Sequence, residues 1–256
     1  MSKIKRLLIL DLNGILVHRV YKKEYYKYQD LFKNEYRNGT IERPLYKGNF
    51  AIWLRPGVKE FLQWCLDHFH IGIWSSVRKE NMVPLIEALL PNESDHSNLL
   101  FYWWQDMCLM EKNDDKNEKT STSFYKCLER VWNTQSLEEK WKLNQKNGNW
   151  REQTLIVDDN KSKVRDNPEF TAIHPQSWKL FDIVESEQDG AYIKLFKKDN
   201  VLEENGALKQ WLQKLLEWEG TVPQFVKNNA YVDPPIEELI NGMNEYLRCN
   251  DAWNDN

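Results

Sequence analysis

Short, unbroken apolar segments that end abruptly in polar side chains are the most regular pattern in this chain. These segments are residues 7–10, 70–74, 99–104 and 154–157. An apolar run of this length without alternation is typical of a strand that is covered on both faces, as strands of a parallel sheet are. Amphipathic helical patterns at residues 58–66 and 79–90 separate them, and strands that alternate with helices predict βαβ units. We therefore predict an α/β fold with a Rossmann-like parallel sheet flanked by helices.

The remaining segments have weaker patterns. Residues 49–54 predict a further strand, and the chain from residue 206 is expected to be helical, which divides it into a domain at 1–200 and a C-terminal helical extension at 201–256 that packs on it. Residues 19–48 are dense in Tyr and Lys without a clear period, which favours a solvated loop; the alternative is a mobile flap whose tyrosines contact a ligand. Loops or surface insertions are also expected at residues 111–123 and 134–150.

Carboxylates follow two of the predicted strands. Asp11 comes directly after the first strand, and Asp158 and Asp159 come directly after the last of the four. Carboxyl ends of parallel strands meet at one edge of the sheet, so three carboxylates would gather there and attract a hard cation such as Mg²⁺. A lone strand-end acid is as often a turn residue, and Ser75, after residues 70–74, could either bind phosphate at a helix start or cap that helix.

Composition narrows the class of protein. The net charge of −4 and the pI near 5.8 argue against a general nucleic-acid binder, although a local basic groove would be compatible with them. The four cysteines have no metal-ligand spacing, and the sequence contains no signal peptide core and no run long enough to span a membrane. We expect a nuclear or cytoplasmic protein with reduced thiols and no membrane contact, and the oligomeric state stays open.

Four motifs together resemble a known family. They are D-L-N-G-I-L-V-H at residues 11–18, L-R-P-G-V at 54–58, I-W-S-S at 73–76 and V-D-D-N at 157–160. Their order resembles the haloacid dehalogenase superfamily, and more narrowly the homology domain of the phosphatases of the RNA polymerase II carboxy-terminal domain. The likeness is greatest to a plant-type, uncharacterised branch with Asn in the first motif. It implies the haloacid dehalogenase-like fold without a large cap.

The resemblance also implies roles for individual residues. Asp11 would be the nucleophile that takes the phosphoryl group, and Lys126 would neutralise charge between them, with Lys119 as the alternative lysine. The further positions implied are phosphate contacts at Leu12, Ser75 and Ser76, and Mg²⁺ ligands at Asp11, Asp158, Asp159 and the backbone carbonyl of Asn13.

Asn13 departs from the family pattern, which has a second aspartate at this position. That aspartate protonates the leaving group, whereas a carboxamide has no proton to exchange at neutral pH. Two functions follow. One is an attenuated Mg²⁺-dependent phosphatase for phosphoserine or phosphothreonine in proteins, and the other is a pseudophosphatase that serves as a protein-interaction module. A receiver domain has similar acids and a lysine but in a different order along the chain.

Overall fold

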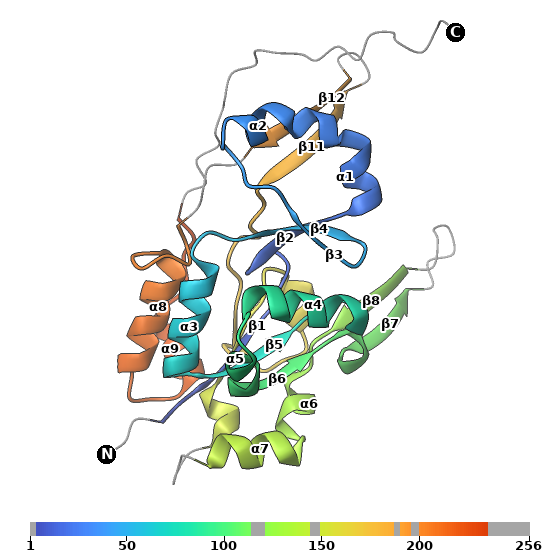
Figure 1. The fold of residues 1–256 in the computed structure, drawn as a ribbon. Coiled ribbons are helices and arrows are strands. Elements are labelled where there is room, and N and C mark those ends of the chain that lie inside the picture. The colour runs from blue at the N-terminus through green and yellow to red at the C-terminus, as the bar shows by residue number, and fades with distance from the viewer. Residues whose placement is uncertain (1–3, 114–120, 144–148, 187–189, 196–199, 235–256) are drawn as a thin grey trace, which may run out of the picture.

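A computed structural model describes residues 4–113, 121–143, 149–186, 190–195 and 200–234 (Figure 1). Its central element is a five-stranded sheet whose paired neighbours all run parallel. In spatial order its strands are β10 (Ala172–Ile173), β9 (Thr154–Val157), β1 (Leu7–Leu10), β5 (His70–Trp74) and β6 (Leu99–Trp103). The strands predicted from the apolar segments at 7–10, 70–74, 99–104 and 154–157 are thus confirmed, with β1 in the centre.

Helices cover both faces of this sheet, and β1 shows the division. Leu8 and Leu10 point into one core and Leu7 and Ile9 into another, because successive side chains of a strand point to opposite faces. The first core is covered by α3 (Val58–His68), α4 (Lys79–Leu89), α8 (Ala207–Glu217) and α9 (Val222–Asn228). The second is covered by α6 (Leu128–Trp132) and α7 (Gln135–Lys142). The predicted α/β class is therefore confirmed.

The described part of the C-terminal extension packs on this domain. Leu208, Leu212 and Leu215 of α8 are fully buried in the core that also contains α3. The apolar helical pattern expected at residues 236–247 lies outside the described residues, and the domain boundary at residue 200 stays a prediction.

A smaller lobe is inserted between β1 and α3, at the top of the view in Figure 1. It contains an antiparallel sheet in the order β2-β4-β3 and, from a later part of the chain, an antiparallel hairpin. Its elements are β2 (Val17–Tyr21), α1 (Lys22–Tyr28), η1 (Gln29–Phe32), α2 (Lys33–Arg37), β3 (Leu45–Lys47), β4 (Phe50–Leu54), β11 (Phe181–Ser186) and β12 (Gly190–Leu195). The lobe has its own core, which includes Tyr25, Tyr28 and Phe32.

This lobe corrects the prediction for residues 19–48 and confirms the strand predicted at residues 49–54. Residues 19–48 are not a solvated loop, because the aromatic side chains of Tyr25, Tyr28 and Phe32 recur at helical spacing and are buried against Trp53. The lysines and tyrosines between them concealed that period. The strand expected at residues 49–54 forms, as β4, but it pairs antiparallel in the lobe instead of joining the parallel sheet.

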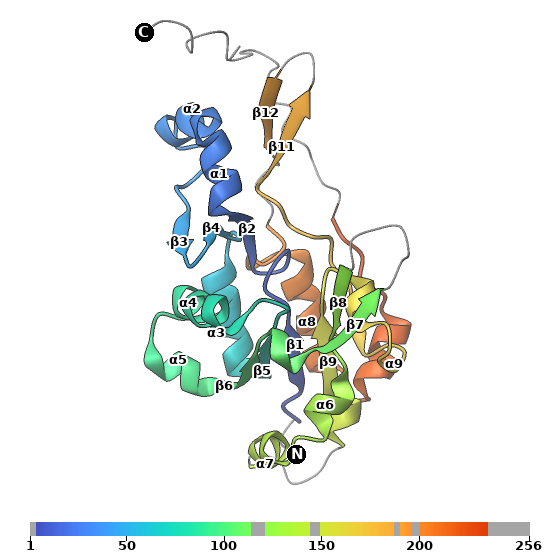
Figure 2. The same cartoon turned by 90° about the vertical axis from the view of Figure 1, so that its right-hand side faces the viewer.

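Two further predicted loops contain regular structure. Residues 111–113 and 121–123, the described ends of the first expected loop, belong to β7 (Leu109–Asn113) and β8 (Ser121–Tyr125), which pair antiparallel and lie side by side in Figure 2. In the expected insertion at 134–150, α7 buries Leu137 and Trp141, while Leu143 is 78% exposed. The remaining short elements are α5 (Glu93–Asn98), η2 (Gln105–Met107), η3 (Trp150–Gln153) and η4 (Lys161–Val164). Within the described ranges, every helix is too short or too polar to cross a membrane.

Candidate active site

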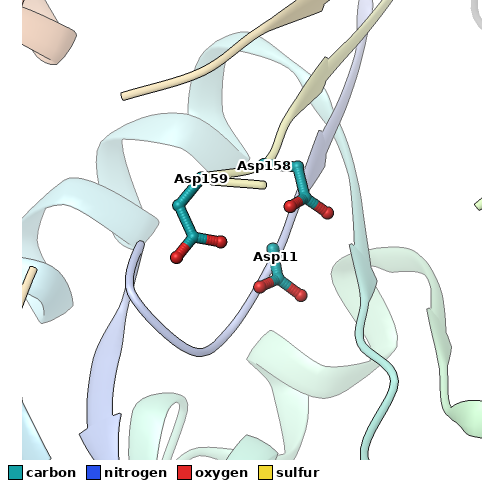
Figure 3. Close-up of side chains that lie close together, drawn as sticks. All are labelled: Asp11, Asp158 and Asp159. Atoms are coloured by element: carbon teal, nitrogen blue, oxygen red, sulfur yellow. The ribbon is translucent and has the colours of Figure 1, made fainter. Parts of the chain in front are cut away.

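The register of the central sheet brings the predicted carboxylates together. Leu10 is paired with Val157, so Asp11 and Asp158 follow at the same level, and the Asp11 N–H donates to the Val157 carbonyl at 2.9 Å. Asp159 is the next residue along. One carboxylate oxygen from each aspartate lies within 4.8 Å of the others, and the three side chains point into one region beyond the strand ends (Figure 3). Asp11 and Asp158 are fully buried, whereas Asp159 is half-buried.

Lys126 joins two of these carboxylates. Its Nζ lies 2.6 Å from Asp11 Oδ1 and 2.6 Å from Asp158 Oδ2, and all three side chains are buried. Burial lowers the pKa of an ammonium, but the negative charges of Asp11 and Asp158 outweigh burial here and raise the pKa of Lys126. Lys126 therefore carries a charge that both carboxylates share.

Lys126 does not lie on a helix, although Phe124, Leu128 and Val131 are spaced like the apolar face of a helix that would include it. It occupies the connection between β8 and α6, where its N–H donates to the Lys163 carbonyl at 2.7 Å. Asn167 secures the other side, because its amide donates to the Lys126 carbonyl at 2.7 Å and its oxygen accepts from the Leu128 N–H. The alternative lysine, Lys119, lies outside the described residues.

The two neighbouring acids that follow β9 have pKa values shifted in opposite directions. Burial would raise the pKa of Asp158, but the charges of Lys126 and Lys163 and the hydrogen bonds to it hold the pKa below its usual value. Burial raises the pKa of Asp159, and the charges of Asp11 and Asp158 add to that rise, although a hydrogen bond with Ser177 opposes it. Of these two carboxylates, Asp159 is therefore the one whose negative charge is less compensated by its surroundings.

Two buried oxygens of the site have no partner among the described residues. They are Asp11 Oδ2 and Asn13 Oδ1, and buried polar atoms are normally hydrogen-bonded. Together with the three clustered carboxylates, these acceptor oxygens are the hard donor set that Mg²⁺ prefers. The residues present thus fit a divalent cation held by Asp11, Asp158 and Asp159.

The loop after β1 is fixed in a conformation that depends on glycine. Gly14 has φ +83°, and a Cβ atom there would overlap the Asp159 carboxylate and lie 2.5 Å from Ser177 Oγ. The buried Arg55 donates to the Ile15 carbonyl at 3.1 Å, and the Trp178 N–H donates to the Gly14 carbonyl at 2.8 Å. The backbone that carries Asn13 is therefore held from two directions.

The two serines predicted to contact phosphate, Ser75 and Ser76, directly follow a strand of the central sheet. Ser75 follows β5, is 2% exposed and donates its N–H to the Trp103 carbonyl, while Ser76 is half-buried. Neither caps α4, because the N-cap of that helix is Arg78 and has no side-chain cap. The side chain of Leu12 is buried in the core, so a phosphate contact there would use the backbone.

Several residues that support the site could not be found from the sequence. The His174 ring contacts the Asp158 carbonyl at 2.8 Å, Ser177 bonds Asp159, and Asn167 holds the Lys126 backbone. Their contacts run largely to backbone atoms and follow no local pattern. His18, at the end of the first motif, is buried: its Nδ1 accepts from the Leu180 N–H, and burial lowers its pKa to about 4.

Comparisons with known proteins identify the family of the chain. The NLI interacting factor-like phosphatase family model matches residues 6–205. An uncharacterized FCP1 homology domain-containing protein of Schizosaccharomyces pombe is 27% identical over 166 residues, which are 64% of this chain and 58% of that protein. The chain thus spans somewhat over half the length of this relative.

Two solved structures of Fcp1 are also similar. One is the fission yeast RNA polymerase II CTD phosphatase in a variant bound to beryllium fluoride, with a TM-score of 0.42, 15% identity and coverage of 69% of this chain and 42% of that one. The other, described as an essential RNA polymerase II CTD phosphatase, has a TM-score of 0.43, 14% identity and coverage of 88% and 52%. Because the family model spans most of the chain, this chain belongs to the NLI interacting factor-like phosphatase family.

Proposed function

We propose that this protein is a Mg²⁺-dependent phosphatase of phosphoserine or phosphothreonine in proteins, attenuated because Asn13 stands in place of a general acid. One observation carries the proposal: Asp11 holds Lys126 with Oδ1 at 2.6 Å, while Asp11 Oδ2 is buried without a partner among the described residues. One oxygen is thus neutralised and oriented, and the other is left for a ligand. That division suits a carboxylate nucleophile.

In this proposal Asp11 Oδ2 attacks phosphorus. The Oδ2–P bond forms as the bond from phosphorus to the substrate oxygen breaks, and water then hydrolyses the aspartyl-phosphate to regenerate the carboxylate. Lys126 orients Asp11 through its contact with Oδ1, and Ser75 would donate to a phosphoryl oxygen. When bound by Asp11, Asp158 and Asp159, Mg²⁺ supplies charge neutralisation for the phosphoryl oxygens.

Asn13 limits the proposed reaction at the leaving group. The departing alkoxide needs a proton, and general acid catalysis is typically worth about 10²–10⁴-fold in rate. A carboxamide cannot supply that proton. The protonation must come from solvent, so phosphate esters with good leaving groups should react far faster than alkyl phosphates.

The same residue favours a second function, a pseudophosphatase that binds phosphorylated partners without turning them over. The support for it is that Asn13 departs from the family pattern, while the carboxylates and Lys126 stay assembled. Binding needs the assembled charges, and only turnover needs the missing acid.

An aryl phosphate assay separates these functions. Hydrolysis of p-nitrophenyl phosphate by the full chain in Mg²⁺ is expected, because this leaving group needs little protonation. Asp11→Asn should abolish it, and Asp166→Asn, at a side chain that is 63% exposed, should leave it unchanged. A wild-type protein that binds phosphate but shows no turnover above Asp11→Asn would favour the interaction module.

A further inference from the structure

Arg19 is a cation of the small lobe whose charge interacts with that of Asp11. It lies on β2, the strand that leaves the loop bearing Asn13, and it is paired with Ile52 of β4. On this face of the antiparallel sheet Val17, Phe50 and Ile52 all join the core of the central domain. The opposite face carries Trp53 into the lobe's own core. Since side chains alternate along a strand, Arg19 is on the face turned toward the central sheet.

The guanidinium of Arg19 is half-buried but unpaired. Its Cζ lies 4.6 Å from the centre of the Phe50 ring. In the part of the chain that the structure describes, it forms no hydrogen bond and no ion pair with a carboxylate. Burial lowers the pKa of Arg19, and the charge of Asp11 acts in the opposite direction. A cation removed from water normally has an anionic partner, so this one points to a ligand.

The charges of the site favour a phosphate monoester bound beside a divalent cation. Three carboxylates and the ammonium of Lys126, which contacts two of them, give a formal charge of −2, which one divalent cation would cancel; Lys163 adds its charge from beyond ion-pair distance. A phosphate monoester then brings about two further negative charges. Lys126 is already shared between Asp11 and Asp158, so the phosphoryl oxygens need another cation, and Arg19 supplies a fork of donors suited to them.

We propose that Arg19 binds the phosphoryl group presented to Asp11 and sets the affinity of the site for phosphate. This inference rests on the proposed function, since both require phosphate at Asp11. In that position the guanidinium spans non-bridging oxygens, where charge is spread in the transition state of phosphoryl transfer. The contact of Cζ with the Phe50 ring, at 4.6 Å from its centre, holds the guanidinium in place and uses none of its N–H donors.

Inorganic phosphate tests this directly, without turnover. The melting temperature of the full chain in Mg²⁺ is titrated with phosphate for the wild type, Arg19→Met, Arg19→Lys and Arg37→Met. Arg19→Met should weaken apparent phosphate affinity by about 10-fold or more, the scale of a charged hydrogen bond. Arg19→Lys should recover part of it. Arg37 is an exposed arginine at the end of α2 in the same lobe, and its variant should match the wild type.

Each result has one meaning because every variant is compared with its own melting temperature without phosphate. Wild-type affinity in Arg19→Met, with phosphate still stabilising the wild type, would overturn the role of Arg19 and leave the proposed function intact. A wild-type protein that phosphate does not stabilise in Mg²⁺ would overturn both. An equal loss of phosphate affinity in Arg37→Met would also contradict the inference, since the affinity would then depend on the net charge of the protein and not on the position of Arg19.

Discussion

Lys126 Nζ lies 2.6 Å from Asp11 Oδ1, in a place where neither side chain has contact with solvent. The two residues are 115 positions apart in the chain, so only the folded sheet and the β8 to α6 connection bring them together. Because the same ammonium also lies 2.6 Å from Asp158, it offsets the repulsion of two buried carboxylates. The pair is therefore part of the fold as well as part of the proposed chemistry.

Removing the buried Lys126 should lower the free energy of unfolding far more than removing the exposed Lys142. Lys126→Met leaves two buried carboxylates without their cation, which is expected to lower the free energy of unfolding by about 3–5 kcal/mol. The matched control is Lys142→Met, whose ion pair with Glu138 is also 2.6 Å long but 55% and 35% exposed, and a loss below about 1 kcal/mol is expected. Urea unfolding in a chelator measures both. Equal losses would mean that burial of the Lys126 pair contributes nothing.

Asp159 should destabilise the metal-free protein at neutral pH. Its pKa is raised by burial and by Asp11 and Asp158, so the folded state binds the proton more tightly than the unfolded one. Stability contributed by this group is therefore lost as pH rises above the unfolded value of about 3.8 and through the folded pKa. Asp159→Asn keeps an acceptor for Ser177 and carries no charge. In a chelator it should melt higher than the wild type at pH 7, and this advantage should vanish below pH 4.

In Mg²⁺ the wild type should instead melt at a higher temperature than Asp159→Asn. The wild type gains stability by binding the ion, and Asp159→Asn should lose most of the gain because it lacks one of the three carboxylates. Asp166→Asn, at an exposed acid, serves as the control for both conditions. An unchanged Mg²⁺-dependent shift in Asp159→Asn would rule out Asp159 as a ligand.

Gly14→Ala should damage the site more than its backbone angle alone explains. The new methyl group would overlap the Asp159 carboxylate and Ser177, in addition to the strain of φ +83°. Gly39→Ala is the matched control, since Gly39 has φ +68° with no atom within 4 Å of an added Cβ. We expect Gly39→Ala to cost about 1 kcal/mol in unfolding free energy and to retain the Mg²⁺ shift, and Gly14→Ala to cost more and lose it. Similar behaviour of the two variants would show that Gly14 is needed for its backbone angle only.

The sequence predicted the parallel sheet well because its strands are unbroken apolar runs. The strands before Asp11, Ser75 and Asp158 are covered on both faces, and so their pattern is undiluted by polar positions. The aspartates at the strand ends followed from this directly. Lys126 was identified only through the family resemblance, because a buried lysine in an extended connection has no local signal.

What the sequence did not predict depends on contacts between distant segments. The core of the small lobe joins Tyr25 and Phe32 to Trp178 and Phe181, which come much later in the sequence. Lysines between the early aromatic residues hide their helical period. Asn167, too, acts through backbone atoms around Lys126. Such contacts exist only once the sheet has set the register, so no spacing rule would have found them.

The central claim is that the site is a phosphatase deprived only of its acid, and Asn13→Asp tests it most directly. The substitution restores a carboxyl group at nearly constant volume, and the neighbouring carboxylates should raise its pKa so that it holds a proton to donate. The measurement is turnover of a phosphoserine peptide in Mg²⁺ by Asn13→Asp and the wild type, with p-nitrophenyl phosphate alongside. Turnover of the peptide should rise by roughly 10²-fold or more, and that of the aryl ester by less. An Asn13→Asp protein that folds and binds Mg²⁺ yet hydrolyses neither substrate would contradict the claim and favour the interaction module.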